Sequence, residues 1–216
     1  MDSAIDPVRE LPSEEFNRAT DTREMLARAA RQREAYNLDD YRIIDIDAHH
    51  FESQSWGEIV ERISDPVIQH IADNFRTNGR LSPGIIQTSG WPTHQNVGGR
   101  IVHDPGSEEN TDGEDTHRQV VLARRALDSM GIDCQISFPT PMLGLGMHPE
   151  NDVEIAIARA YNRWVTECVV SMDDRIRTSL YLPFNDAPAC ERMVEEFGET
   201  KGVIGFTVTS VHYRPV

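Results

Sequence analysis

Carboxylate and imidazole side chains follow an apolar run in the segment 43–52, which reads IIDIDAHHFE. The apolar start is typical of a buried parallel strand. Because alternate side chains of a strand share a face, Asp45, Asp47 and His49 are expected to point to one side of it. Three ligand-type groups at the C-terminal end of such a strand predict a catalytic or metal site, since catalysis in a βα barrel takes place at that end. The alternative is a strand end whose polar side chains cap the following helix.

The individual side chains of this segment suit different tasks. His49 is a candidate metal ligand because neutral imidazole is a common zinc donor and its strand neighbours are carboxylates. His50 points to the other side of a regular strand and is a weaker choice. Glu52 is a candidate catalytic residue, as a proton carrier or as a partner of the metal ligands.

The motif DIDAH at 45–49 resembles the first-strand motif of the amidohydrolase-related family, which includes amino-carboxymuconate-semialdehyde decarboxylase and aromatic-acid decarboxylases. That family usually carries His-x-His here, and Asp47-Ala48-His49 resembles its branches with an acidic first position. Segments similar to later parts of the family follow in order between residues 41 and 210. They are 126–133, 135–139, 161–164, 174–176, 181–183 and 202–206.

The resemblance implies a metal-dependent enzyme that decarboxylates or hydrolyses a small, aromatic or unsaturated carboxylic acid. Asp47 and His49 are then ligands of one divalent ion, Zn²⁺ or alternatively Mn²⁺, which activates water or orients the substrate. Arg100, in the segment GGRIV at 98–102, resembles the family's loop arginine that holds a substrate carboxylate. The planar fork of arginine suits bidentate carboxylate binding, although a surface salt bridge is the alternative. Lactone or amide hydrolysis uses the same ligands.

Three further histidines are candidate substrate contacts because of their places in the chain. His94 lies in a long loop, His148 lies in an apolar loop after the second strand, and His212 follows the fourth strand. His212 is also a candidate third metal ligand, but the resemblance places that ligand on a fifth strand.

Helical and strand patterns alternate through the second half of the chain, which predicts a parallel sheet. Strands are expected at about 43–47, 133–138, 178–183 and 203–209, and helices at 116–130, 150–171 and 186–197. A (β/α)8 barrel takes about 250 residues, whereas this chain has 216. We therefore expect an α/β fold of (β/α)8 TIM-barrel type, truncated after about the fourth strand. The alternative function is a non-catalytic or incomplete fragment that needs a complementary C-terminal half.

The barrel part is expected to span residues 41–216, after an N-terminal helical extension at 1–40. The extension is rich in Ala, Arg and Glu, and must dock on its own barrel or on a neighbouring subunit because a lone helix with a thin apolar stripe is unstable. Residues 53–115 form an insertion in which Asp65 and Pro66 begin a helix and a long polar loop follows.

The composition limits the class of partner. The net charge of −15 argues against nucleic acid and against anionic membrane surfaces. There is no apolar run long enough for a transmembrane helix, and the N-terminus does not have the pattern of a signal peptide. Three scattered cysteines indicate the reduced thiols of a cytoplasmic protein. The expected partners are a small carboxylic acid and either further copies of the chain or a C-terminal half.

Overall fold

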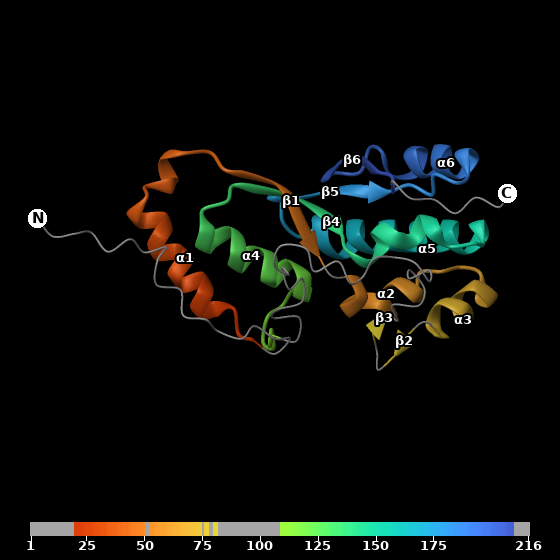
Figure 1. The fold of residues 1–216 in the computed structure, drawn as a ribbon, viewed down its shortest axis with the longest axis horizontal. Coiled ribbons are helices and arrows are strands. Elements are labelled where there is room, and N and C mark those ends of the chain that lie inside the picture. Colours follow the sequence, from red (N-terminus) through yellow and green to blue (C-terminus); the bar gives the residue numbers. More distant parts are fainter. Residues whose placement is uncertain (1–19, 51, 75, 78–79, 82–108, 210–216) are drawn as a thin grey trace, which may run out of the picture.

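The computed structural model describes residues 20–50, 52–74, 76–77, 80–81 and 109–209. These residues form an α/β structure around a parallel four-stranded sheet (Figure 1). The strands are β1 (Ile44–His50), β4 (Cys134–Pro139), β5 (Ile176–Tyr181) and β6 (Val203–Thr207), and they lie in this order across the sheet. A short antiparallel ribbon consists of β2 (Arg76–Thr77) and β3 (Arg80–Leu81). The predicted α/β class and the four predicted strands are confirmed, while closure into a barrel stays a prediction.

A helix connects each pair of neighbouring strands in the main sheet. These connections are α4 (Arg118–Met130), α5 (Asn151–Val165) with its π-helical continuation η5 (Thr166–Val170), and α6 (Ala187–Phe197). The remaining helices are α1 (Arg23–Ala35), η1 (Leu38–Asp40), η2 (Glu52–Ser55), α2 (Trp56–Val60), α3 (Pro66–Asn74) and η4 (Pro141–Met147). The three predicted connecting helices are therefore confirmed to within a few residues at each end.

Short-range capping interactions set several helix ends. The Oδ1 atom of Asp65 accepts hydrogen bonds from the backbone N–H groups of Val67 and Ile68, at 2.8 and 3.1 Å. Asp186 caps α6 in the same way, through the N–H of Ala189 at 2.7 Å. Such bonds satisfy N–H groups that have no partner within the helix. They explain why these helices begin where the sequence predicted.

The extension helix α1 packs against α4 of its own chain. Arg33 donates to the backbone oxygen of Asp128 at 2.5 Å and to the carboxylate of Asp39 at 2.5 Å. Gly131, which ends α4 with a φ of 72°, allows this approach, because a Cβ atom there would lie 2.8 Å from Nε of Arg33. Of the two docking modes expected for the extension, the structure shows local packing.

Helix α5 forms the centre of the core and covers one face of the sheet. Ile176, Thr178 and Leu180 of β5 are fully buried on this face. By contrast, the side chains of Ile46 and Ile204 are 69% and 55% exposed in the described structure. The sheet therefore has one covered face and one face that the described residues leave open (Figure 1).

A buried amide joins α5 to β5. Asn162 donates from Nδ2 to the backbone oxygen of Tyr181 at 2.9 Å and accepts from its N–H through Oδ1 at 3.1 Å. Asn162 is fully buried. Both backbone groups lie where water does not reach them, so the side chain stands in for a strand partner.

We predict that Asn162→Ala lowers the free energy of unfolding by about 2–4 kcal/mol, because it removes both hydrogen bonds from buried backbone groups. Chemical denaturation measures the change. Asn151→Ala, at the exposed start of the same helix, is the matched control and should change stability by less than about 0.5 kcal/mol. Equal effects of the two substitutions would contradict the bridging role of Asn162.

Candidate functional site

An additional residue in β1 decides where its polar side chains point. Asp45 pairs with Gln135 of β4, but the next pair toward the C-terminus joins Ala48 to Ser137, so β1 has one residue more than its partner between them. This irregularity is a β-bulge, which interrupts the alternation of faces. Asp45 therefore lies on the helix-covered face with Ala48. The expectation that it shares a face with the next two polar residues of the strand is wrong.

Asp47 and His49 remain together on the open face of the sheet. The Oδ1 atom of Asp47 lies 3.5 Å from Nε2 of His49, and the two side chains are 87% and 35% exposed. The other ring nitrogen of His49, Nδ1, lies 3.2 Å from the hydroxyl of Thr140. The hydroxyl thus restrains the imidazole and leaves Nε2 directed at the carboxylate. Within the described part of the chain, no three His, Cys, Asp or Glu side chains come together as a metal site.

Glu52 holds the segment after β4 in place. It is fully buried, and its two carboxylate oxygens accept from the backbone N–H groups of Met142 at 2.5 Å and Thr140 at 3.1 Å. Burial raises the pKa of Glu52 to about 7, against the opposing effect of these N–H donors. A carboxyl with this pKa exchanges protons near neutrality. Its contacts in the structure are with backbone, so a catalytic role for it stays a prediction.

A buried polar chain behind β1 was not found from the sequence. Nδ1 of His50 lies 2.8 Å from the hydroxyl of Ser137, and Nε2 lies 3.0 Å from the hydroxyl of Tyr161. Burial, followed by the neighbouring His49 and His117, lowers the pKa of His50 to about 3. Burial, followed by the charge of Glu52, raises the pKa of Tyr161 well above its usual value. The hydrogen-bonded series of Ser137, His50 and Tyr161 is therefore uncharged, and it links β1, β4 and α5.

A second histidine cluster lies beside the first. Nε2 of His117 lies 3.2 Å from a carboxylate oxygen of Glu58 and 3.4 Å from the hydroxyl of Ser55. Trp164 donates to the same Glu58 at 2.9 Å. Because serine and acid meet the same ring nitrogen, this group differs from a catalytic triad, in which they contact opposite nitrogens. Nδ1 of His117 accepts from the N–H of Gln119 and thereby caps α4.

The remaining candidates lie at or beyond the strand ends. His148 follows η4, and its Nδ1 accepts from the backbone N–H of Glu150 at 3.1 Å. His148 thus lies in the connection that leaves the C-terminal end of β4, and its role as a substrate contact stays a prediction. Arg100, His94 and His212 lie outside the described residues.

Comparison with protein-family models and with curated proteins finds no match to this chain. Among the described residues, no helix has both the length and the apolar character needed to cross a membrane. A functional assignment therefore depends on the residues of the site.

We predict that the high pKa of Glu52 lowers stability as the pH rises. The unfolded chain releases this proton near pH 4.5 and the folded chain near pH 7. Between these values the folded state binds more protons, so the free energy of unfolding falls as pH increases. Between pH 5 and pH 7.5 this contribution falls by about 2 kcal/mol.

Denaturation of the natural chain and of Glu52→Gln at both pH values measures this contribution as the change in their stability difference. Glu61→Gln, at an exposed position, is the matched control and should leave the pH dependence unchanged. A difference between the natural chain and Glu52→Gln that is the same at both pH values would refute the raised pKa.

Proposed function

We propose that this chain provides part of the active site of a metal-dependent decarboxylase or hydrolase of the amidohydrolase-related type. Its substrate is a small, aromatic or unsaturated carboxylic acid, and its four parallel strands are part of a (β/α)8 barrel. The observation that carries the proposal is the Asp47–His49 pair, which runs from the middle toward the C-terminal end of the first parallel strand and has donor atoms 3.5 Å apart. Catalytic groups in barrels of this type come from the same strand ends.

The spacing of the pair suits two ligands of one ion. In tetrahedral zinc sites, metal–ligand distances of about 2.0–2.2 Å separate neighbouring donor atoms by about 3.3–3.6 Å. The hydrogen bond from Nδ1 of His49 to Thr140 supports the same assignment, because metal-binding imidazoles usually engage their second nitrogen in this way. Zn²⁺ is the first choice, and Mn²⁺ is the second.

Other residues of the chain would then act on the substrate. A divalent ion supplies Lewis-acid chemistry that polarises a substrate oxygen or activates water. Arg100 binds the substrate carboxylate, and His94, His148 and His212 contact the rest of the molecule. Glu52 holds the loop that carries Thr140, and thereby the orientation of His49. Its buried carboxyl is also the candidate proton carrier.

A second candidate function is assembly without catalysis. The exposed Ile46 and Ile204 lie on the open face of the sheet, and β1 and β6 are its two edges within the described structure. Open edges and exposed apolar side chains favour association with another surface. Further copies of the chain or a complementary C-terminal half would supply it.

We predict that His49→Ala and Asp47→Asn each weaken Zn²⁺ binding by at least about tenfold, because each removes one donor from a site that needs about three. Equilibrium dialysis with elemental analysis measures the affinity. His70→Ala is the matched control, since His70 is exposed on α3. Unchanged zinc affinity in both pair variants would refute the metal assignment.

Turnover assays separate the two functions. The zinc-loaded chain, alone and with any purified complementary half, is given a panel of aromatic and unsaturated acids, lactones and amides, and carbon dioxide and hydrolysis products are measured. Release of carbon dioxide that His49→Ala abolishes supports decarboxylation, and acid or amine products support hydrolysis. Zinc binding without either product, together with stable self-association, would favour the assembly function.

For an acid substrate found in this way, we predict that Arg100→Lys lowers kcat/KM. The loss corresponds to about 1–3 kcal/mol of transition-state binding, because lysine does not reproduce the bidentate contact. Steady-state kinetics measure the loss. Arg31→Lys, on the surface of α1, is the control. Unchanged kinetics in Arg100→Lys would contradict the substrate role and favour the alternative that Arg100 forms a surface salt bridge.

A further inference from the structure

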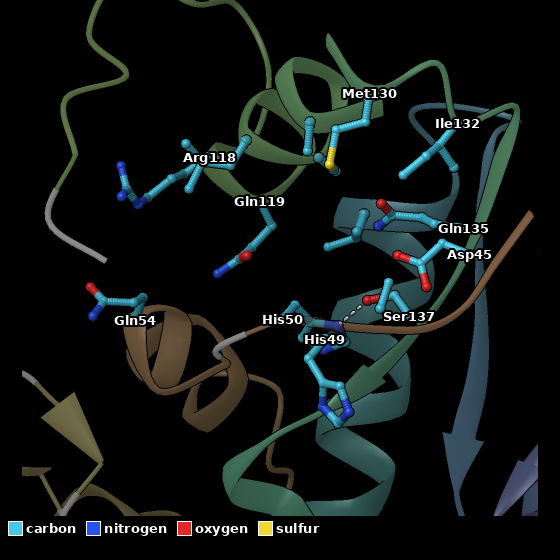
Figure 2. Close-up of a pocket in the computed structure, with 15 residues that line it drawn as sticks. Asp45, His49, His50, Gln54, Arg118, Gln119, Met130, Ile132, Gln135 and Ser137 are labelled. Atoms are coloured by element: carbon cyan, nitrogen blue, oxygen red, sulfur yellow. Dashed lines mark hydrogen bonds between the residues drawn. The ribbon is translucent and has the colours of Figure 1, made fainter. Parts of the chain in front are cut away.

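A cavity of about 330 Å³ separates α4 from β1 and β4 (Figure 2). Interfaces between a helix and a sheet are normally packed, with few voids larger than a water molecule. Pockets that bind small molecules have volumes of about 300–1,000 Å³. The gap beneath α4 therefore has the size of a ligand site, and it lies on the sheet face opposite to Asp47.

The two walls of this cavity differ in chemistry. The helix side is apolar along Leu122, Ala123, Ala126 and Met130 together with Ile132, and it is polar only at the first turn of α4, where Arg118 and Gln119 line the cavity. The sheet side is polar and includes Asp45, Gln135 and Ser137. Figure 2 shows the Asp45 carboxylate and the Gln135 amide directed off the strands toward α4. Polar groups that face an apolar wall lose free energy unless a partner binds them.

Asp45 is the charged group on the sheet wall. Its Oδ1 atom accepts from the backbone N–H of Asp47 at 3.0 Å, and this bond leaves Oδ2 without a hydrogen bond to any residue of the described structure. Arg118 also lines the cavity, but its guanidinium donates to the backbone oxygen of Glu109 and points away from Asp45 in Figure 2. The cavity floor therefore presents a carboxylate to whatever enters.

We propose that this cavity binds a small primary ammonium ion that carries an apolar substituent, such as an arylalkylamine. The ammonium group donates to Oδ2 of Asp45 and to the amide oxygen of Gln135, since it has three donors and no acceptor. The substituent packs on the apolar wall formed by α4. The net charge of −15 concentrates cations at the protein surface. A neutral ligand of the same shape would leave the carboxylate without a counter-charge.

This ligand differs from the acid of the proposed function, and the two assignments depend on opposite faces of β1. The bulge that directs Asp47 and His49 to the open face directs Asp45 into the cavity. Binding at Asp45 can therefore be tested without a metal and without turnover.

The test titrates the metal-free 216-residue chain with 2-phenylethylamine and, separately, with the neutral 2-phenylethanol, and follows the methyl signals of Leu122 and Met130 by NMR. Saturable shifts are expected with the amine, and at least about tenfold weaker binding with the alcohol, because a charge-assisted hydrogen bond is lost. Equal affinities, or no saturable shifts at millimolar amine, would overturn the proposal.

Two variants locate the site. Asp45→Asn should weaken amine binding by at least about tenfold, whereas Asp47→Asn makes the same charge change on the other face and should leave it within about twofold. Ala126→Leu fills the cavity from the helix wall and should abolish binding, while circular dichroism shows a folded chain. Retained binding in either Asp45→Asn or Ala126→Leu would show that the amine binds elsewhere.

Discussion

The additional residue between Asp45 and Ala48 in β1 is the constraint on which the rest of the site depends. A regular strand would place Asp45, Asp47 and His49 on one face and leave the sheet wall of the cavity beneath α4 without a carboxylate. With the bulge, β1 presents the Asp47–His49 pair to the open face and sends Asp45 and His50 toward the helices. Bulges often occur beside active sites because they redirect single side chains in this way.

The polar chain behind β1 keeps that irregular strand in place. Ser137, His50 and Tyr161 join β1, β4 and α5 through hydrogen bonds of 2.8 and 3.0 Å in a buried environment. Partnered groups of this kind restrict a core to one arrangement, because any slip would leave a buried polar atom without a partner. Consecutive histidines thus have separate tasks. His50 stays neutral inside, and His49 presents a ring nitrogen outside, where it remains accessible to a ligand.

Local features of the chain were sufficient to predict most elements. Asp65, Asp186 and Gly131 act on their own helix ends, so their effect is visible within a few residues of sequence. The bulge was missed because it depends on pairing with β4, about ninety residues further along the chain. The contact of Glu52 with the segment after β4 was missed for a similar reason. Its partners there are backbone N–H groups, which carry no side-chain signature in the sequence. Residue types can suggest a metal pair, but they do not show the cavity, which results from the separation of a helix from a sheet.

The enzyme and assembly functions share one physical requirement. Asp47 and His49 are 87% and 35% exposed, so water competes for their donor atoms and screens their charge, and two such donors hold an ion weakly. A surface that covers the open face would exclude that water and bring a third ligand. The same surface would bury Ile46 and Ile204, at roughly 1.5–3 kcal/mol for each fully buried side chain. If Asp47 and His49 bind an ion as proposed, completion of the metal site and burial of the open sheet face would therefore be a single association event, and the affinity for the ion would depend on the partner that covers the sheet.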